Sequence, residues 1–168
     1  MRTLSLGPPF MTRIDDPSHD QEAGSADATL DSTRTDDTRI RAVRPLISPA
    51  LLLDELPVRE AELNLVERTR TDIGRVLRGE DDRLVVVVGP CSIHDHDQAL
   101  DYARLLKRTA DELKRELIVV MRVYFEKPRT TVGWKGYIND PLLDGSFRMN
   151  EGLRLARRLL LDVTALGL

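Results

Sequence analysis

The sequence predicts a parallel α/β fold, the start of a (β/α)8 barrel or of a doubly wound sheet. Residues 84–88 (LVVVV) and 117–124 (LIVVMRVY) are continuous apolar runs, which is typical of strands buried on both faces of a parallel sheet. Residues 95–113 repeat apolar side chains at helical spacing, and strand, helix and strand in this order predict a right-handed crossover. Because a full barrel needs about 250 residues, residues 84–168 suffice for roughly its first two β/α units.

The chain divides into three parts by composition. Residues 1–37 are rich in Asp, Ser, Thr, Gly and Pro, and they cannot bury enough apolar surface to offset the entropy lost on ordering. We therefore predict a disordered tail over residues 1–37, an N-terminal extension over 38–80 and the first β/α units of the barrel or sheet over 81–168.

The extension is predicted to contain two helices. Residues 51–53 (LLL), flanked by prolines, predict a short helical turn. Pro57 suits the first turn of a longer helix, and Gly79 is expected to end it. The apolar residues predicted to face inward are Leu63, Val66, Ile73, Val76 and Leu77, and the residues predicted to face water are Glu62, Arg68, Asp72 and Arg75.

Two more helices should follow the predicted strands. Asp95 or Asp97 can cap the first, and Asn150 can cap the second, which should run to about residue 162. Gly167 is expected to end that second helix. The residues predicted to point inward are Ala99, Ala103, Leu106, Ala110 and Leu113 in the first, and Leu153, Ala156, Leu160 and Val163 in the second.

Bulk composition excludes several classes of function. The 168 residues carry a net charge of −3, which argues against binding nucleic acid by bulk electrostatics. No apolar run is long enough to span a membrane. A single cysteine without an export signal predicts a cytoplasmic location, where thiols stay reduced.

Two loops follow the predicted strands, at the edge where α/β folds bind ligands. The first, residues 89–95 (GPCSIHD), contains Cys91. The second begins at Arg122, which interrupts an apolar run and therefore requires a carboxylate or phosphate partner. Lys127, Arg129 and Thr130 add an ammonium, a guanidinium and a hydroxyl. Together these donors predict a site for an anionic, phosphorylated ligand.

Each of these residues also has a plain structural interpretation. Cys91 could be a small buried apolar residue, and His94 a loop or capping residue. Lys127 and Arg129 could belong to a solvated loop, and Trp134 could be a packing anchor. From the residues alone, the prediction ends at an anionic-ligand site on the rim of a parallel sheet.

Three long segments carry a family resemblance. VVVVGPCSIHD (85–95), MRVYFEKPRTTVGWKGYINDP (121–141) and DGSFRMNEGLRLARRLLLD (144–162) closely resemble the class I 3-deoxy-D-arabino-heptulosonate 7-phosphate (DAHP) synthase family, over residues 36–168. The resemblance implies the N-terminal part of a (β/α)8 TIM barrel with a helical extension. It implies a transferase that condenses phosphoenolpyruvate with D-erythrose 4-phosphate, releases phosphate and opens the shikimate pathway to aromatic amino acids.

The resemblance also implies roles for residues. Cys91 is expected to bind a divalent metal of the Mn, Fe, Zn or Co class, Arg122 to bind phosphoenolpyruvate, and Lys127 to act as the catalytic cation between both substrates. Erythrose 4-phosphate is expected to contact Lys127, Pro128, Arg129 and Thr130. The family's other metal ligands lie on later strands that this chain lacks, so we expect the isolated chain to be inactive.

Partners follow from the same resemblance. The full-length enzyme is expected to be a homo-oligomer, a dimer or tetramer, in which Asp36, Asp37 and Ile40 help to build the dimer interface and a feedback-inhibitor pocket. The alternative is a truncated homologue that docks on a full-length synthase through residues 36–80, without catalysis. The sister enzyme that uses arabinose 5-phosphate fits KPRT (127–130) and GWKG (133–136) less well.

Overall fold

The structure is a computed structural model and describes residues 40, 42–127 and 133–168. The predicted disordered tail therefore lies outside the described residues. The chain separates into two units, residues 1–44 and 45–168. Of the first unit, residues 40 and 42–44 are described, and they are exposed and belong to no helix or strand.

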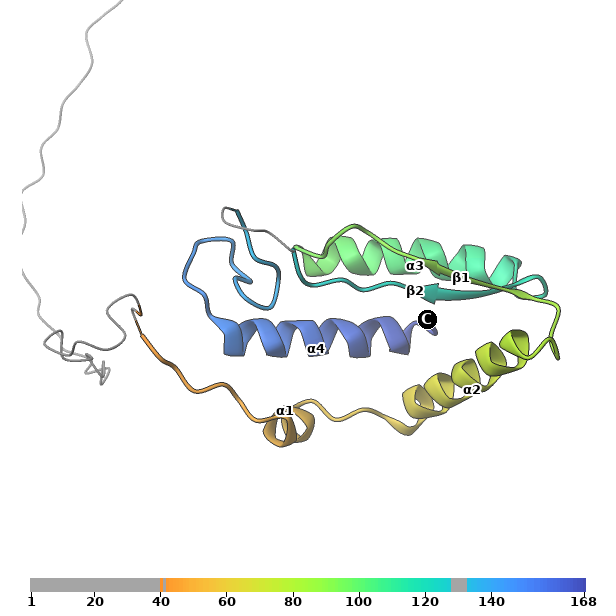
Figure 1. The fold of residues 1–168 in the computed structure, drawn as a ribbon, viewed down its shortest axis with the longest axis horizontal. Coiled ribbons are helices and arrows are strands. Elements are labelled where there is room, and N and C mark those ends of the chain that lie inside the picture. Colours follow the sequence, from red (N-terminus) through yellow and green to blue (C-terminus); the bar gives the residue numbers. More distant parts are fainter. Residues whose placement is uncertain (1–39, 41, 128–132) are drawn as a thin grey trace, which may run out of the picture. The chain divides into compact units, whose positions relative to one another are not determined.

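The described elements follow the predicted order (Figure 1). In the extension, α1 (Pro49–Glu55) and α2 (Glu60–Leu77) confirm the two predicted helices. They are followed by β1 (Leu84–Val88), α3 (His96–Glu112), β2 (Leu117–Met121) and α4 (Met149–Ala165). None of these helices is both long and apolar enough to cross a membrane.

The two strands pair in parallel, as predicted, with Leu84 opposite Leu117 and Val88 opposite Met121. The predicted second strand was too long, because β2 ends at Met121 and not at residue 124. The Arg122 amide still donates to the Val88 carbonyl at 2.8 Å. Beyond it β1 turns away at Gly89 and Pro90, and proline has no N–H for the ladder. The described fold is therefore α/β with a small, partial parallel sheet.

The core lies where α3, α4 and the end of β2 meet. Ala99 and Ala103 of α3 and Leu159 and Val163 of α4 are buried with Met121. The alanines confirm part of the predicted inward face of α3, and their small side chains let the helices approach closely. Leu113, also predicted to point inward, is 39% exposed, because it follows the last turn of the helix. Asp95 caps α3, as predicted, by accepting from the Gln98 amide at 2.8 Å.

In α4 the predicted inward residues Ala156 and Val163 are buried, but Leu160, also predicted to point inward, is not. Leu160 is 43% exposed and Leu159 is fully buried instead. A Cβ on Gly152 would lie 2.1 Å from the Ile138 carbonyl oxygen, so this glycine seats the first turn of α4 directly on the preceding loop. That contact sets the rotation of the helix, and the apolar spacing alone could not reveal it.

The predicted cap of α4 was also wrong. The helix begins at Met149, so Asn150 lies inside its first turn. The Asn150 side chain accepts from the Ile47 amide at 2.9 Å and donates to the Pro45 carbonyl at 3.1 Å. It therefore ties the extension to α4. Gly167, at φ 93°, follows the helix as predicted.

Further along the same helix, arginines hold the extension too. The Arg154 guanidinium pairs with the Glu55 carboxylate at 2.6 and 2.8 Å. The Arg157 Nε donates to the Leu56 carbonyl at 3.0 Å, and Leu56 itself is buried. Since α1 buries none of its own residues, these polar contacts and Leu56 secure it to α4.

The buried face of α2 differs from the predicted one. Glu62, predicted to face water, is buried, whereas Leu63, Val66 and Leu77 are exposed. The cause is a capping box in which the Glu62 carboxylate accepts from the Arg59 amide at 2.8 Å and pairs with its guanidinium. That pairing lowers the pKa of Glu62. The box starts the helix at Glu60, beyond Pro57, while Gly79 ends it as predicted, with φ at 72°.

Candidate active site

The carboxyl ends of β1 and β2 meet at one edge of the sheet, where both predicted loops begin. Gly89 is essential to this geometry, because a Cβ at that position would lie 2.0 Å from the Arg122 carbonyl oxygen. The loop after β1 is also tied to the chain after β2 by a bond of 2.7 Å from the Ile93 amide to the Tyr124 carbonyl. The two loops thus form one structural unit.

Arg122 lies just past the end of β2 and is exposed, so the prediction that it interrupts a buried strand was wrong. One guanidinium nitrogen donates to the carbonyls of Pro90 at 2.9 Å and Cys91 at 3.4 Å. Its central carbon lies 4.3 Å from the centre of the Tyr124 ring, a cation–π distance. These partners are neutral and orient the guanidinium, and no carboxylate of the described residues pairs with it.

Cys91 and Lys127 lie side by side in this unit. Cys91 is exposed, so the interpretation of it as a small buried residue is wrong. The Lys127 ammonium lies 3.8 Å from the Cys91 sulfur. Two cations, and a thiol that lies more than 30 residues before them in the chain, are therefore gathered at one edge. Among the described residues, neither Arg122 nor Lys127 is within ion-pair distance of a carboxylate.

The described residues just before residue 128 pair with those just after residue 132 in a short antiparallel bridge. Glu126 pairs with Gly136, and the Lys127 amide donates to the Lys135 carbonyl at 3.1 Å. Gly136 has φ at 123°, and a Cβ there would lie 2.3 Å from the Phe125 carbonyl oxygen. A glycine is therefore required for the close approach that fixes the backbone of Lys127.

Aromatic residues connect this bridge to the hydrophobic core. The Phe125 and Tyr137 rings stack with centres 6.1 Å apart. Tyr137 is buried, and this burial, with smaller contributions from the carboxylates of Asp95 and Asp97, raises the pKa of its hydroxyl. The indole of Trp134 packs against the core and donates to the Asp140 carbonyl at 2.7 Å, in keeping with a packing anchor.

Tyr124 is the member of the site that sequence reasoning missed. Its ring lies under the Arg122 guanidinium, whereas the sequence assigned it to the end of the second strand and gave it no role in ligand binding. The spacing could have revealed it, because side chains two residues apart in extended chain lie on the same side. An aromatic residue at that spacing from a cation is a cation–π candidate.

Several predicted residues lie outside the described part of the chain: Pro128, Arg129, Thr130, Asp36 and Asp37. Ile40 is described and is 46% exposed. Cys91 offers a thiol, a suitable ligand for zinc, iron or manganese. However, the described residues contain no group of three or more His, Cys, Asp or Glu side chains placed to hold a metal ion. On these residues alone the expected metal centre is not formed.

Comparison with known proteins points to one family. A family model described as the DAHP synthetase I family matches residues 55–166. The chain is 54% identical over 164 residues to a phospho-2-dehydro-3-deoxyheptonate aldolase of Amycolatopsis methanolica, covering 98% of this chain and 78% of that one. It is 55% identical over 135 residues to the Phe-sensitive enzyme of that name from Escherichia coli K12, covering 80% of this chain and 39% of that one.

A solved structure agrees. The phospho-2-dehydro-3-deoxyheptonate aldolase of Francisella tularensis superposes with a TM-score of 0.72 at 48% identity, covering 77% of this chain and 38% of that one. The chain thus spans roughly two fifths of the length of the longer relatives it matches. Because the family model covers more than half of the chain and the relatives are this similar, the chain belongs to the DAHP synthetase I family.

Proposed function

We propose that this chain is the substrate-binding N-terminal part of an enzyme that condenses phosphoenolpyruvate with D-erythrose 4-phosphate to give DAHP and phosphate. One observation carries the proposal: two cations, Arg122 and Lys127, meet beside Cys91 at the carboxyl edge of a parallel sheet, with no carboxylate of the described chain in ion-pair distance. The names of the relatives support the same reaction class. In the complete enzyme, β1, α3, β2 and α4 would be the first units of a (β/α)8 barrel, whose ligands bind at this edge.

The two cations suit the chemistry of phosphoenolpyruvate. This substrate carries a phosphate and a carboxylate, and a guanidinium offers planar, paired donors that match either group. The Pro90 and Cys91 carbonyls and the Tyr124 ring hold the Arg122 guanidinium in place before a ligand arrives, so little ordering remains to be done on binding. We assign phosphoenolpyruvate to Arg122 and Lys127.

Bringing the substrates together is mainly an electrostatic problem, because both carry negative charge. In the proposed reaction the enol carbon of phosphoenolpyruvate attacks the aldehyde of erythrose 4-phosphate. Lys127 would lie between the two and reduce their repulsion, which favours an attack geometry. We assign the erythrose 4-phosphate contacts to Lys127, Pro128, Arg129 and Thr130. Cys91 would supply one thiolate ligand to a divalent metal in the complete enzyme.

The test separates binding from catalysis. The expected result is that phosphoenolpyruvate binds the chain in isothermal titration, and that Arg122→Gln weakens binding by about tenfold or more, the loss expected for a charge-assisted hydrogen bond. Arg115→Gln is the matched control, since Arg115 is an exposed cation at the opposite end of the sheet, and it should leave binding unchanged. Equal weakening by both variants, or no binding at all, would contradict the assignment.

Turnover provides the second part of the test. With metal and both substrates, the isolated chain should release no phosphate, because its described residues do not form a metal centre. Robust phosphate release by the purified chain would overturn this part of the proposal.

A second candidate function is a non-catalytic interaction module that docks on a full-length synthase through residues 36–80. The observation that favours it is the number of large apolar side chains left exposed in the extension, among them Val43, Leu51 and Leu63. Co-purification of the chain with a full-length synthase, lost on deletion of residues 1–80, is the expected result. Absence of association at micromolar concentration would remove this candidate.

A further inference from the structure

A carboxylate precedes the Lys127 cation directly in the chain. Glu126 lies in the short antiparallel bridge and pairs there with Gly136. Side chains of neighbouring residues in an extended chain point to opposite faces. Lys127 is followed by Pro128 in the sequence, which also favours extended backbone at the lysine. The face on which the Glu126 side chain is held therefore helps to set the face on which the Lys127 side chain lies.

The Glu126 carboxylate is bound by the side chain of Asn139. The Asn139 amide nitrogen donates to Glu126 Oε2 at 2.9 Å. The Lys127 ammonium has a different neighbour, the Cys91 sulfur at 3.8 Å. The acid and the cation of this dipeptide thus have separate partners, although they are adjacent in the chain.

Asn139 is itself held in place by the residue that follows it. Asp140 is buried, its amide donates to the Gly136 carbonyl at 3.0 Å, and its carbonyl accepts from the Trp134 indole at 2.7 Å. Its two carboxylate oxygens accept from the Gly145 amide at 3.2 and 3.1 Å. These bonds fix the backbone next to Asn139, so its side chain reaches Glu126 from a fixed position.

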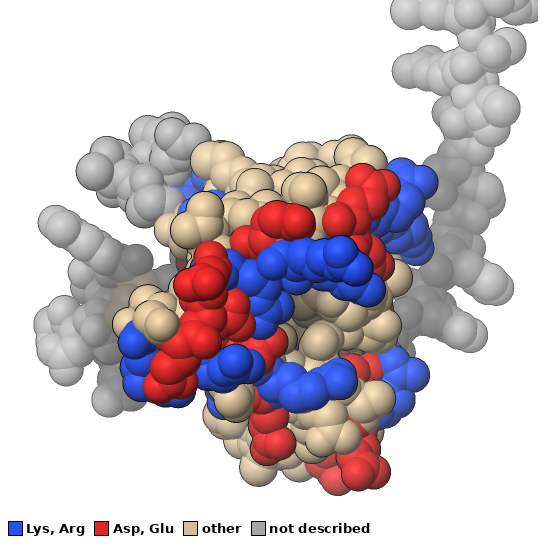
Figure 2. Space-filling view, turned by 90° about the vertical axis from the view of Figure 1, so that its right-hand side faces the viewer, with Lys and Arg blue, Asp and Glu red and all other residues tan. Residues whose placement is uncertain are grey.

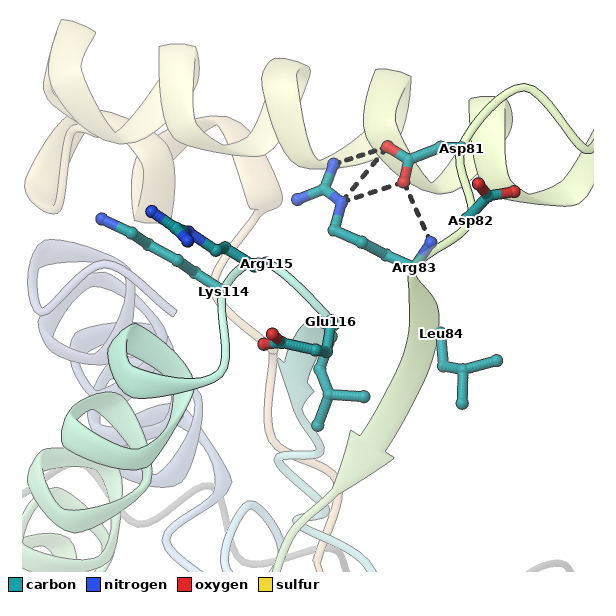
Figure 3. A pocket seen from close by; sticks show the side chains of 8 residues that line it. Asp81, Asp82, Arg83, Leu84, Lys114, Arg115 and Glu116 are labelled. Atoms are coloured by element: carbon teal, nitrogen blue, oxygen red, sulfur yellow. Dashed lines mark hydrogen bonds and ion pairs between the residues drawn. The ribbon is translucent and has the colours of Figure 1, made fainter.

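The amino end of the strands shows how an acid near a cation behaves without such a partner. There the Asp81 carboxylate accepts from the guanidinium of Arg83, two residues further along the chain, at 2.7 Å (Figure 3). Figure 2 faces this end of the molecule and shows blue and red side chains lying against one another. Because opposite charges attract at this range, a released Glu126 carboxylate would turn to the Lys127 ammonium in the same way.

We propose that Asn139 is a positioning residue for Lys127, a role that rests on the proposed binding of phosphoenolpyruvate by this lysine. By binding Glu126, Asn139 keeps the carboxylate away from the Lys127 ammonium, which stays beside Cys91 and open to an anionic substrate. A free Glu126 carboxylate would compete with the substrate at high effective concentration, because it belongs to the same chain. Asn139 therefore acts without touching the substrate.

A double-mutant cycle read by isothermal titration tests this mechanism. Asn139→Ala should weaken phosphoenolpyruvate binding by about fivefold, the upper range for an exposed ion pair, because Glu126 then pairs with Lys127. Glu126→Gln alone should change binding by less than about twofold, since its charge is already held away. In the double variant, Glu126→Gln should restore most of the affinity that Asn139→Ala has lost.

A residue that only braced the loop would give another result. Asn139→Ala would then weaken binding equally whether residue 126 is glutamate or glutamine, and this additive result would overturn the proposal. Unchanged binding in Asn139→Ala would overturn it as well. Asn64→Ala removes an exposed asparagine side chain from α2 and is the matched control. It should leave binding unchanged, and a loss equal to that of Asn139→Ala would count against the proposal.

Amide hydrogen exchange tests the placement of Lys127 without any ligand. The Lys127 amide donates to the Lys135 carbonyl at 3.1 Å, and it should exchange about fivefold faster in Asn139→Ala, because the bridge has lost a bond that closes it. Failure of the unmodified chain to bind phosphoenolpyruvate would contradict the proposed function, and exchange would then decide the positioning by itself. Faster exchange supports it, and unchanged exchange overturns it.

Discussion

The two ends of the same pair of strands treat an arginine differently. At the amino end, Arg83 pairs with the carboxylates of Asp81 and Asp72, which neutralise its charge. The pair with Asp72 connects α2 to the start of β1. At the carboxyl end, Arg122 is bound by two carbonyls and an aromatic ring, which fix its position, and no carboxylate of the described chain pairs with it. The partners of a cation, more than its presence, distinguish a structural arginine from a ligand-binding one.

The largest expected effect comes from the glycine that lets the carboxyl ends meet. Gly89→Ala should destabilise the chain by about 3 kcal/mol, because the added methyl group overlaps the Arg122 carbonyl and the backbone must shift. Urea unfolding measures the change. Gly79→Ala is the control: its φ of 72° strains an alanine, but no atom lies within 4 Å of the new Cβ, so about 1 kcal/mol is expected. Similar losses in both variants would show that the close contact at Gly89 is unimportant.

A smaller effect should separate the two arginines. Arg83→Gln should lower the urea midpoint clearly, since it leaves Asp81 and Asp72 without their partner. Arg122→Gln should lower it much less, because only neutral, exposed partners are lost. For phosphoenolpyruvate binding the order should be the opposite: Arg122→Gln should weaken binding more than Arg83→Gln does. An Arg122 variant that unfolds more readily than the Arg83 variant would show that both arginines mainly stabilise the fold.

The smallest effect should appear on acidification. Hydrogen bonds from Arg83 lower the pKa of Asp81 from its usual 3.8 to about 2. A carboxyl group whose pKa is lower in the folded state stabilises that state above the usual value, and this stabilisation is lost as the pH falls from 3.8 toward 2.

Comparison with Asp81→Asn measures this contribution. The difference in urea midpoint between the two proteins should therefore shrink across that pH range. The difference in urea midpoint between the unmodified chain and Arg122→Gln should stay constant over the same pH range, because no carboxylate of the described chain pairs with Arg122. A difference for Asp81→Asn that does not change with pH would contradict the assigned pairing.

The sequence predicted the order of elements well because apolar spacing reports burial directly. It failed where a single contact, and not apolar spacing, decides how a helix packs. Glu62 is buried and pairs with Arg59, three residues earlier, and Gly152 packs on the Ile138 carbonyl at the start of α4. Neither contact alters the apolar pattern. Similarly, Asn150 is a residue type that often caps helices, but its side chain accepts a hydrogen bond from Ile47, 103 residues away in the chain.

The candidate site could be predicted in part for a physical reason. Parallel strands bring their carboxyl ends to one edge, so Cys91, Arg122 and Lys127 could be expected to approach one another, and the structure places them together. Their partners could not be predicted, because the bonds of Arg122 to the Pro90 and Cys91 carbonyls depend on where the strand ends.

The carboxyl end of the strands is expected to bind the anionic substrate, and the amino end is not. Chemical-shift mapping of amides during titration with phosphoenolpyruvate tests both ends in one experiment. Saturable shifts are expected at residues 89, 91, 122 and 127, with none at residues 81–84 and 114–117. Shifts concentrated at Lys114 and Arg115, or equal shifts at both ends, would contradict it.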